Sequence, residues 1–237
     1  MSGFFITGTD TGVGKTFVAC ALIHALQRRG LTVAPMKPIA AGTVDVNGVP
    51  MNEDVALLMD ATGQRFPLHA VNPYCFKSAI APHIAATREN IDVDMAVIQT
   101  AYSYLAERAD VVLVEGAGGF LVPLSENDSM ALIPAALQLP VLLVVGMRLG
   151  CINHALLTVE AMRSRGLTLA GWIANSPGGR MNAFDENLST LKRMIGAPLI
   201  GNISHAKAIG TNQTLRAARL AASQLSTEIL VPVPPKD

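Results

Sequence analysis

Short apolar runs alternate along the chain with longer segments in which apolar positions recur at helical spacing. The runs predict buried strands, because each is short and bounded by turn-forming residues. They are "FFITG" (4–8), "TVAPMKP" (32–38), "DVVLVEG" (110–116), "VLLVVG" (141–146), "LTLAGWIAN" (167–175) and "APLIGNI" (197–203). Helices are predicted at 15–29, at 52–63 with Asn52 as cap, at 92–109 and at about 153–164, and two more complete the alternation. Residues 64–91 contain several prolines and are predicted to be mostly loop.

This alternation predicts an α/β fold, in which one doubly wound, mostly parallel sheet carries helices on both faces. No internal repeat or linker interrupts the pattern, so residues 1–230 are expected to form a single domain, followed by a proline-rich tail at 231–237. Half of the residues are hydrophobic and only 15% are charged, which suits a sheet that is buried on both faces.

Charge and cysteine content narrow the range of functions. Lys+Arg and Asp+Glu balance at 18 each, so no broad basic field is expected to attract nucleic acid or an acidic membrane. The three cysteines show no metal-binding spacing and the start shows no secretion signal, which indicates a cytoplasmic protein. The most apolar stretch, 131–147, is interrupted by Pro134, Gln138 and Pro140, and it predicts a short helix, a turn and a strand rather than a membrane span.

The segment "GTDTGVGKT" (8–16) joins the first strand to the first helix and resembles a phosphate-binding loop with one additional residue. Gly12 and Gly14 allow backbone N–H groups to converge on phosphate oxygens. Lys15 supplies positive charge to the phosphates, and the Thr16 hydroxyl can bind Mg²⁺. The additional residue leaves this mechanism intact, because the cradle depends chiefly on the second half of the loop. The segment therefore predicts nucleotide binding.

Two further charged residues lie where predicted strands end, at the edge at which α/β sheets bind ligands. Glu115 ends an apolar strand and is a candidate Mg²⁺ ligand near Thr16, whereas Lys37 could stabilise charge on a transferred phosphoryl group. Asp54 is a second candidate ligand. Its alternative role is that of an acid favoured by the dipole at a helix N-terminus, and the alternative for Lys37 is an exposed lysine.

The turn "GMRLGCINH" (146–154) follows another strand and opens a helix. Free N–H groups at a helix N-terminus bind anions, and Asn153 could add a side-chain donor. Cys151 and His154 lack a third orienting partner, so thiol catalysis is not expected there.

With these motifs in hand, the sequence resembles the dethiobiotin synthetases, a P-loop NTPase-like family of ATP-dependent ring-closing enzymes. The resemblance runs from residue 4 to about 203, and the family's phosphate loop has the same additional residue. The matching segments are "FFITGTDTGVGKT", "KPIAAGT", "VNPYCF", "APHIAA", "VLVEGAGG", "LPVLLVVGMRLGCINHALLT" and "LAGWIAN".

The resemblance implies a reaction of 7,8-diaminononanoate, CO₂ and ATP through a carbamate and a carbamic-phosphoric anhydride. It implies catalytic roles for Lys15, Lys37 and Thr11, and Mg²⁺ binding by Thr16, Asp54 and Glu115. Nucleotide binding is implied for Gly12, Val13, Gly14, Lys15, Thr16, Glu115, Gly118 and, at the base, Asn175. Substrate binding is implied for Thr11, Lys37, Ala41, Gly150, Cys151 and Asn153, of which the last three would belong to the partner chain of a homodimer.

Two positions and one segment depart from the family pattern. Ala41 stands where a serine often contacts substrate, Gly12 replaces an acid found in some members, and 203–212 matches the base-binding loop poorly, which predicts weak base selectivity. The main alternative is a switch ATPase of the partitioning or metal-insertase type, but Asp10 occupies the position of the lysine that marks those proteins. A paralogous synthetase acting on another diamine is a further alternative.

Overall fold

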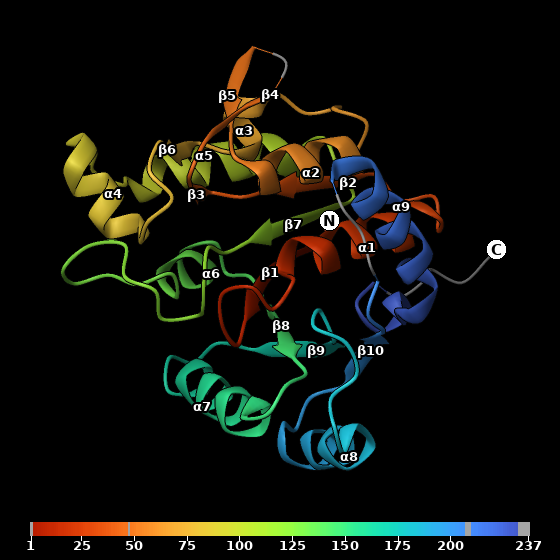
Figure 1. Ribbon diagram of the computed structural model, residues 1–237. Coiled ribbons are helices and arrows are strands. Elements are labelled where there is room, and N and C mark those ends of the chain that lie inside the picture. The colour runs from red at the N-terminus through yellow and green to blue at the C-terminus, as the bar shows by residue number, and fades with distance from the viewer. Residues whose placement is uncertain (1, 47, 207–209, 232–237) are drawn as a thin grey trace.

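The computed structural model describes residues 2–46, 48–206 and 210–231. At its centre lies a six-stranded parallel sheet with the strand order β10-β9-β8-β1-β7-β2 (Figure 1). This sheet confirms the predicted doubly wound α/β fold. Its strands are β1 (Ser2–Gly8), β2 (Val33–Met36), β7 (Val111–Glu115), β8 (Val141–Gly146), β9 (Leu169–Asn175) and β10 (Leu199–Ile203).

Helices cover both faces of this sheet, as the apolar strands require. On one face α1 and α9 lie side by side, and α1 is buried nearly all round because the sheet and α9 enclose it (Figure 1). The other face packs against α5, α6, α7 and α8. The helices are α1 (Lys15–Gln27), α2 (Glu53–Ala61), α3 (Leu68–Val71), α4 (Pro82–Glu89), α5 (Met95–Ala106), α6 (Leu132–Ala136), α7 (Cys151–Arg163), α8 (Phe184–Met194) and α9 (Thr211–Ala221), with 3₁₀ turns at Ala222–Gln224 and Thr227–Ile229.

The prediction of a mostly irregular 64–91 segment is wrong. This segment contains α3, α4 and β6 (Tyr74–Phe76), which pairs in parallel with β3 (Ile39–Ala41), and a nearby hairpin joins β4 (Val44–Val46) to β5 (Val49–Met51). Pro82 occupies the first turn of α4, where a missing N–H costs nothing, so that proline starts a helix instead of excluding one. Similarly, α7 begins two residues before the predicted Asn153, because Gly150 reverses the chain with a φ of +93°.

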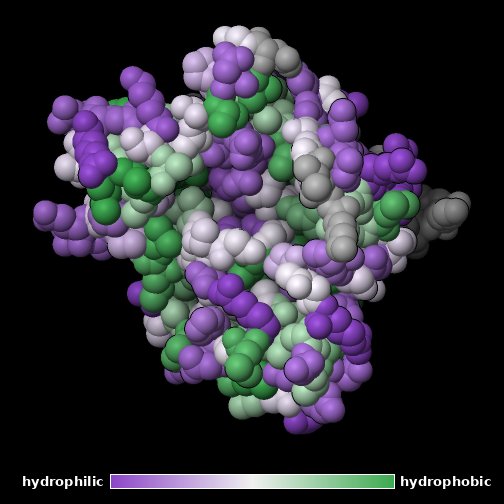
Figure 2. Space-filling model, in the orientation of Figure 1, coloured by the Kyte–Doolittle hydropathy of each residue, from purple (hydrophilic) through white to green (hydrophobic). Residues whose placement is uncertain are grey.

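The sheet order brings the predicted chemistry to one edge. Strand β1 lies between β7 and β8, and Ile6 of β1 pairs with Glu115 of β7, so the loop after β1 lies beside the end of β7. On the face shown in Figure 2, hydrophobic side chains form small patches separated by hydrophilic ones. Within the described ranges, no helix is long and apolar enough to cross a membrane. Most of the predicted tail, residues 232–237, lies outside those ranges.

Candidate functional site

The loop between β1 and α1 has the backbone geometry of an anion cradle. Gly12 and Gly14 adopt φ values of +73° and +84°, a region that strains other L-residues. No side chain caps the N-terminus of α1, so its first N–H groups remain available to a bound anion. The side chain of Asp10 accepts a hydrogen bond from the Thr11 N–H at 2.7 Å and pairs with Arg148, which braces the first half of the loop.

Three predicted site residues from distant parts of the chain meet beside this loop. The Lys37 ammonium lies 2.6 Å from Glu115 Oε1 and 2.8 Å from Asp54 Oδ2. The Thr16 hydroxyl donates to the same Glu115 oxygen at 2.8 Å. Lys37 and Glu115 are 4% and 1% exposed, so the alternative of a surface lysine does not hold.

The charges of this cluster stabilise one another. Burial works against a charge on Lys37, but Glu115 and Asp54 outweigh it and raise the Lys37 pKa above its usual value. Burial also disfavours the charged form of Asp54, yet the ammonium of Lys37 holds the Asp54 pKa below its usual range. Lys15 differs, since burial exceeds the attraction of Glu115 and lowers the Lys15 pKa. An anion placed beside Lys15 would therefore stabilise its charged form.

Two asparagines outside the predicted set position the cluster. Asn52 caps α2 by accepting from the Asp54 N–H at 3.0 Å, as predicted, and its Nδ2 donates to the carbonyls of Ala41 and Gly42. Asn72 is buried, and its Nδ2 donates to the Lys37 carbonyl at 2.6 Å. The sequence signal for Asn72 was its place in the "VNPYCF" segment, but nothing in that segment indicated its contact with Lys37.

The oxygen atoms of the cluster suit a hard divalent cation. Glu115 Oε2 is buried without a hydrogen-bond partner, although such atoms are normally satisfied. Within the described ranges no three His, Cys, Asp or Glu side chains form a metal site, so a cation here would have two carboxylates and the Thr16 hydroxyl. Mg²⁺ fits this donor set, because it commonly takes few carboxylates and completes its shell with water and phosphate oxygens.

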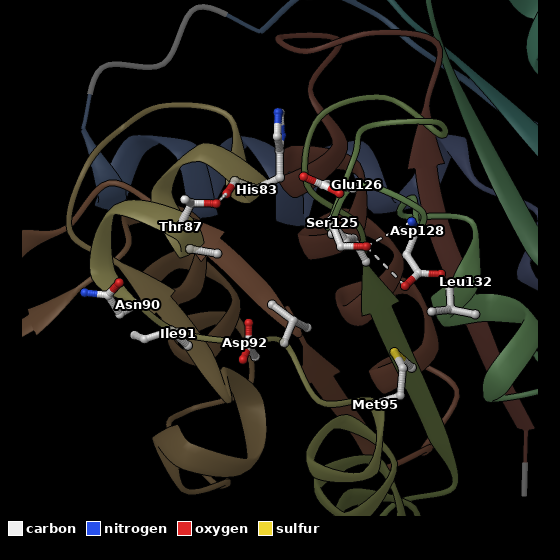
Figure 3. A pocket seen from close by; sticks show the side chains of 13 residues that line it. His83, Thr87, Asn90, Ile91, Asp92, Met95, Ser125, Glu126, Asp128 and Leu132 are labelled. Carbon is white, nitrogen blue, oxygen red and sulfur yellow. Dashed lines mark hydrogen bonds between the residues drawn. The ribbon is translucent and has the colours of Figure 1, made fainter.

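A cavity of about 690 Å³ opens beside the loop, and the charged cluster forms part of its wall. It is lined by Thr11, Gly12, Gly14, Lys15, Thr16, Lys37, Ala41, Asn52, Asp54, Ala79, Ile80, Ala81, Pro82, Glu115, Ala117, Gly118 and Val122. A second cavity of about 530 Å³ lies between α4 and residues 124–128, where Ser125 bonds to Asp128 (Figure 3). None of the predicted site residues lines this second cavity.

Five predicted residues do not line the larger cavity, and one of them, Val13, is buried within the phosphate loop. Gly150 and Cys151 start α7, where Cys151 is buried and Asn153 is exposed, and none of the three contributes to its lining. Asn175 ends β9 and is buried beneath the phosphate loop, with its Nδ2 2.7 Å from the Val13 carbonyl. The base-binding segment predicted at 203–212 lies partly outside the described ranges.

Comparisons with known proteins agree with this geometry. A family model described as "AAA domain" matches residues 2–213. Solved structures share the fold at low identity: MinD of Aquifex aeolicus, 15% identical over the full length of both chains with a TM-score of 0.59, and a ParA family ATPase of Chlorobium tepidum TLS, 12% identical over 97% of each chain with a TM-score of 0.51.

Closer relatives are found among curated sequences. An ATP-dependent dethiobiotin synthetase of Aromatoleum aromaticum is 52% identical over 92% of this chain and 96% of the relative. One of Nitrosospira multiformis is 52% identical over 84% of this chain and 86% of the relative. At this identity and coverage, and with the phosphate loop and the predicted cluster in place, the chain belongs to the dethiobiotin synthetase family.

Proposed function

We propose that this protein closes the ureido ring of dethiobiotin from 7,8-diaminononanoate and CO₂ at the expense of ATP. The name of its relatives supports this reaction. The observation that carries the proposal is the convergence of Lys15, Lys37, Thr16, Asp54 and Glu115 on one cavity beside the phosphate loop. Two cations suit phosphoryl transfer, and the carboxylates suit a metal ion and the amines of the substrate.

The reaction divides into three steps. One amine nitrogen attacks CO₂ and loses a proton, which gives a carbamate. A carbamate oxygen attacks the γ-phosphorus of ATP, and ADP leaves. The second amine attacks the carbamate carbon, loses a proton and expels phosphate, which closes the five-membered urea.

Each of the site residues has a role in this proposal. The ammonium groups of Lys15 and Lys37 stabilise negative charge on the phosphates and the carbamate. Thr11 and Gly118 lie on the cavity wall, from which Thr11 would face the reacting groups and Gly118 the nucleotide. Mg²⁺, held by Thr16, Asp54 and Glu115, supplies charge neutralisation on the phosphate oxygens when it is bound.

The substrate carboxylate requires a separate anion site. Gly150, Cys151 and Asn153 stand at the N-terminus of α7, which has no side-chain cap, so N–H groups of its first turn would bind the carboxylate. The Cys151 N–H would have to leave the Arg148 carbonyl, to which it donates at 2.9 Å. Because these residues do not line the cavity of their own chain, the proposal assigns them to the partner in a twofold homodimer. Leu149, beside them, is 95% exposed, as expected of a residue that a second chain covers.

Phosphate release from ATP tests the proposal. It should depend on both 7,8-diaminononanoate and CO₂, stop with EDTA and return with Mg²⁺, and yield dethiobiotin by mass spectrometry. Release that needs neither diamine nor CO₂ would favour the switch ATPase. Release with another diamine only would identify a paralogous synthetase, and full activity without any divalent ion would exclude the metal site.

A further inference from the structure

Asn175 makes a contact that a base-binding role does not require. Its side chain is 4% exposed, and its Nδ2 donates to the carbonyl oxygen of Val13, 162 positions earlier in the chain, at 2.7 Å. Val13 precedes Gly14 in the second half of the phosphate loop. Asn175, at the end of β9, thus holds a backbone carbonyl of the phosphate loop that follows β1.

The backbone of Asn175 is itself fixed. Its carbonyl accepts from the Met147 N–H at 2.7 Å, and Asn175 pairs with Gly146 at the ends of β9 and β8. A side chain with only two rotatable bonds on a fixed strand keeps its amide in one place. The Val13 carbonyl is therefore held by a rigid donor.

Gly14 shows how closely the two segments pack. A Cβ atom at Gly14 would overlap Asn175 Nδ2, so the asparagine fills the space that the missing side chain leaves. Gly14 also has a φ of +84°. Two independent constraints, backbone conformation and contact with Asn175, therefore require glycine at this position.

The contact determines the direction of one N–H group. Described peptide bonds are trans, and across a trans peptide the carbonyl of one residue and the N–H of the next point in opposite directions. With the Val13 carbonyl turned toward Asn175, the Gly14 N–H points away from it. Gly14 lines the large cavity and Asn175 does not, so the N–H direction matches that of a phosphate donor.

We infer that Asn175 is a positioning residue for phosphate binding, which fixes the Val13–Gly14 peptide so that its N–H faces the nucleotide phosphates. This inference rests on the proposed function. It uses Nδ2 of Asn175 and leaves Oδ1 to the predicted contact with the base. The two roles separate experimentally, because a phosphate chain without a nucleoside retains only the first.

Binding of inorganic tripolyphosphate in the presence of Mg²⁺, measured by calorimetry, tests the inference. In Asn175→Ala the affinity for tripolyphosphate should fall about tenfold, the effect of one lost hydrogen bond, and the affinity for ATP should fall at least as much. The matched control is Asn202→Ala on the neighbouring strand β10, which should bind both ligands like the wild type. Thermal unfolding would establish that both variants are folded at the assay temperature.

A second variant covers the case in which Asn175→Ala does not fold. Asn175→Asp keeps the shape of the side chain, but its carboxylate accepts hydrogen bonds and cannot donate to the Val13 carbonyl. The amide resonance of Gly14 should move when tripolyphosphate is added to the wild type and should not move in this variant. A wild-type response in Asn175→Asp, or unchanged tripolyphosphate affinity with weakened ATP binding in Asn175→Ala, would overturn the inference. Failure of the wild-type protein to bind tripolyphosphate would overturn the inference, and failure to bind ATP as well would overturn the nucleotide site itself.

Discussion

At the residue scale, Lys37 is the counter-ion of two carboxylates. Its ammonium touches Glu115 and Asp54, the same side chains that are proposed to hold Mg²⁺. A divalent cation between those oxygens would compete with the ammonium for them. Binding of Mg²⁺ is therefore expected to displace the Lys37 ammonium from these oxygens and to free it for the phosphates.

Lys37→Gln should destabilise the protein in the absence of metal, because it removes the ammonium in direct contact with buried Glu115 and leaves only the charge of Lys15 nearby. Loss of one partner of a buried ion pair costs about 3 kcal/mol, the low end of the usual range, because Lys15 remains near Glu115. For a chain of this size Tm should fall by about 6–12 °C, and Mg²⁺ should restore part of the loss. The control Lys192→Gln changes an exposed lysine on α8 and should leave Tm unchanged. An unaltered Tm in Lys37→Gln would refute the counter-ion role.

The same substitution should slow the chemical step more than it weakens ATP binding. Lys37 is expected to act on charge that develops during phosphoryl transfer, and one lost donor of that kind costs roughly 3 kcal/mol, or about a hundredfold in kcat. Steady-state kinetics at saturating Mg²⁺ separate this effect from the stability effect. A kcat within about twofold of the wild type would remove Lys37 from the catalytic set.

At the scale of elements, the N-cap residue Asn52 fixes the position of α2. Asn52 accepts from the Asp54 N–H and donates to the carbonyls of Ala41 and Gly42, which joins the helix N-terminus to the end of β3. The cap therefore fixes the helix turn that carries Asp54, and both Asn52 and Asp54 line the cavity. Its contribution to the stability of α2 can be separated by experiment from its contribution to Mg²⁺ binding by Asp54.

Asn52→Ala and Asp94→Ala form a matched pair for that separation. Asp94 caps α5 in the same way, accepting from the Ala96 N–H at 2.8 Å, but it does not line the large cavity. Each substitution should cost about 1 kcal/mol and lower Tm by about 2–4 °C. Only Asn52→Ala should also raise the Mg²⁺ concentration needed for half-maximal activity, since only this cap positions Asp54. Equal Mg²⁺ requirements in the two variants would show that the Asn52 cap does not contribute to metal binding.

The sequence predicts those parts of this arrangement that depend on local sequence patterns, and it does not predict contacts between distant residues that no such pattern connects. The apolar strands, the phosphate loop and the approach of Thr16 to Glu115 follow from local patterns and from the rule that parallel strands end at one edge. The pairing of β3 with β6 does not, because three-residue strands among prolines carry no periodicity. The Asn175–Val13 bond is also not predictable, since no local pattern connects residues 162 positions apart.

At the scale of the whole molecule, the proposed homodimer divides each site between two chains. Lys15 would come from one chain and Asn153 from the other. Lys15→Ala should abolish activity through the phosphates, whereas Asn153→Ala should raise KM for the diamine most, because the carboxylate is bound before and during the reaction.

Refolding the two variants together tests the shared site. In a mixed dimer one site carries both defects and the other carries neither, so random pairing of equal amounts should restore roughly a quarter of the sites. Lys15→Ala mixed with Lys37→Gln is the matched control, since both residues serve the same chain's cavity and no intact site can form. Assays at a low diamine concentration keep the activity of Asn153→Ala alone close to zero, because its KM for the diamine is raised. No recovery, with mixed dimers verified by mass spectrometry, would exclude the shared site.

The position of β1 has a consequence for biosynthesis. It lies in the sheet between β7 and β8, and Asn175 of β9 holds its loop, yet it is translated before all three of these strands. Its apolar strand must wait for more than a hundred residues to be translated before either neighbour can pair with it. Such long-range pairing is slow and leaves hydrophobic segments open to aggregation in the nascent chain. We therefore expect ribosome-bound chains that end before Asn175 to depend on chaperones and to bind no nucleotide.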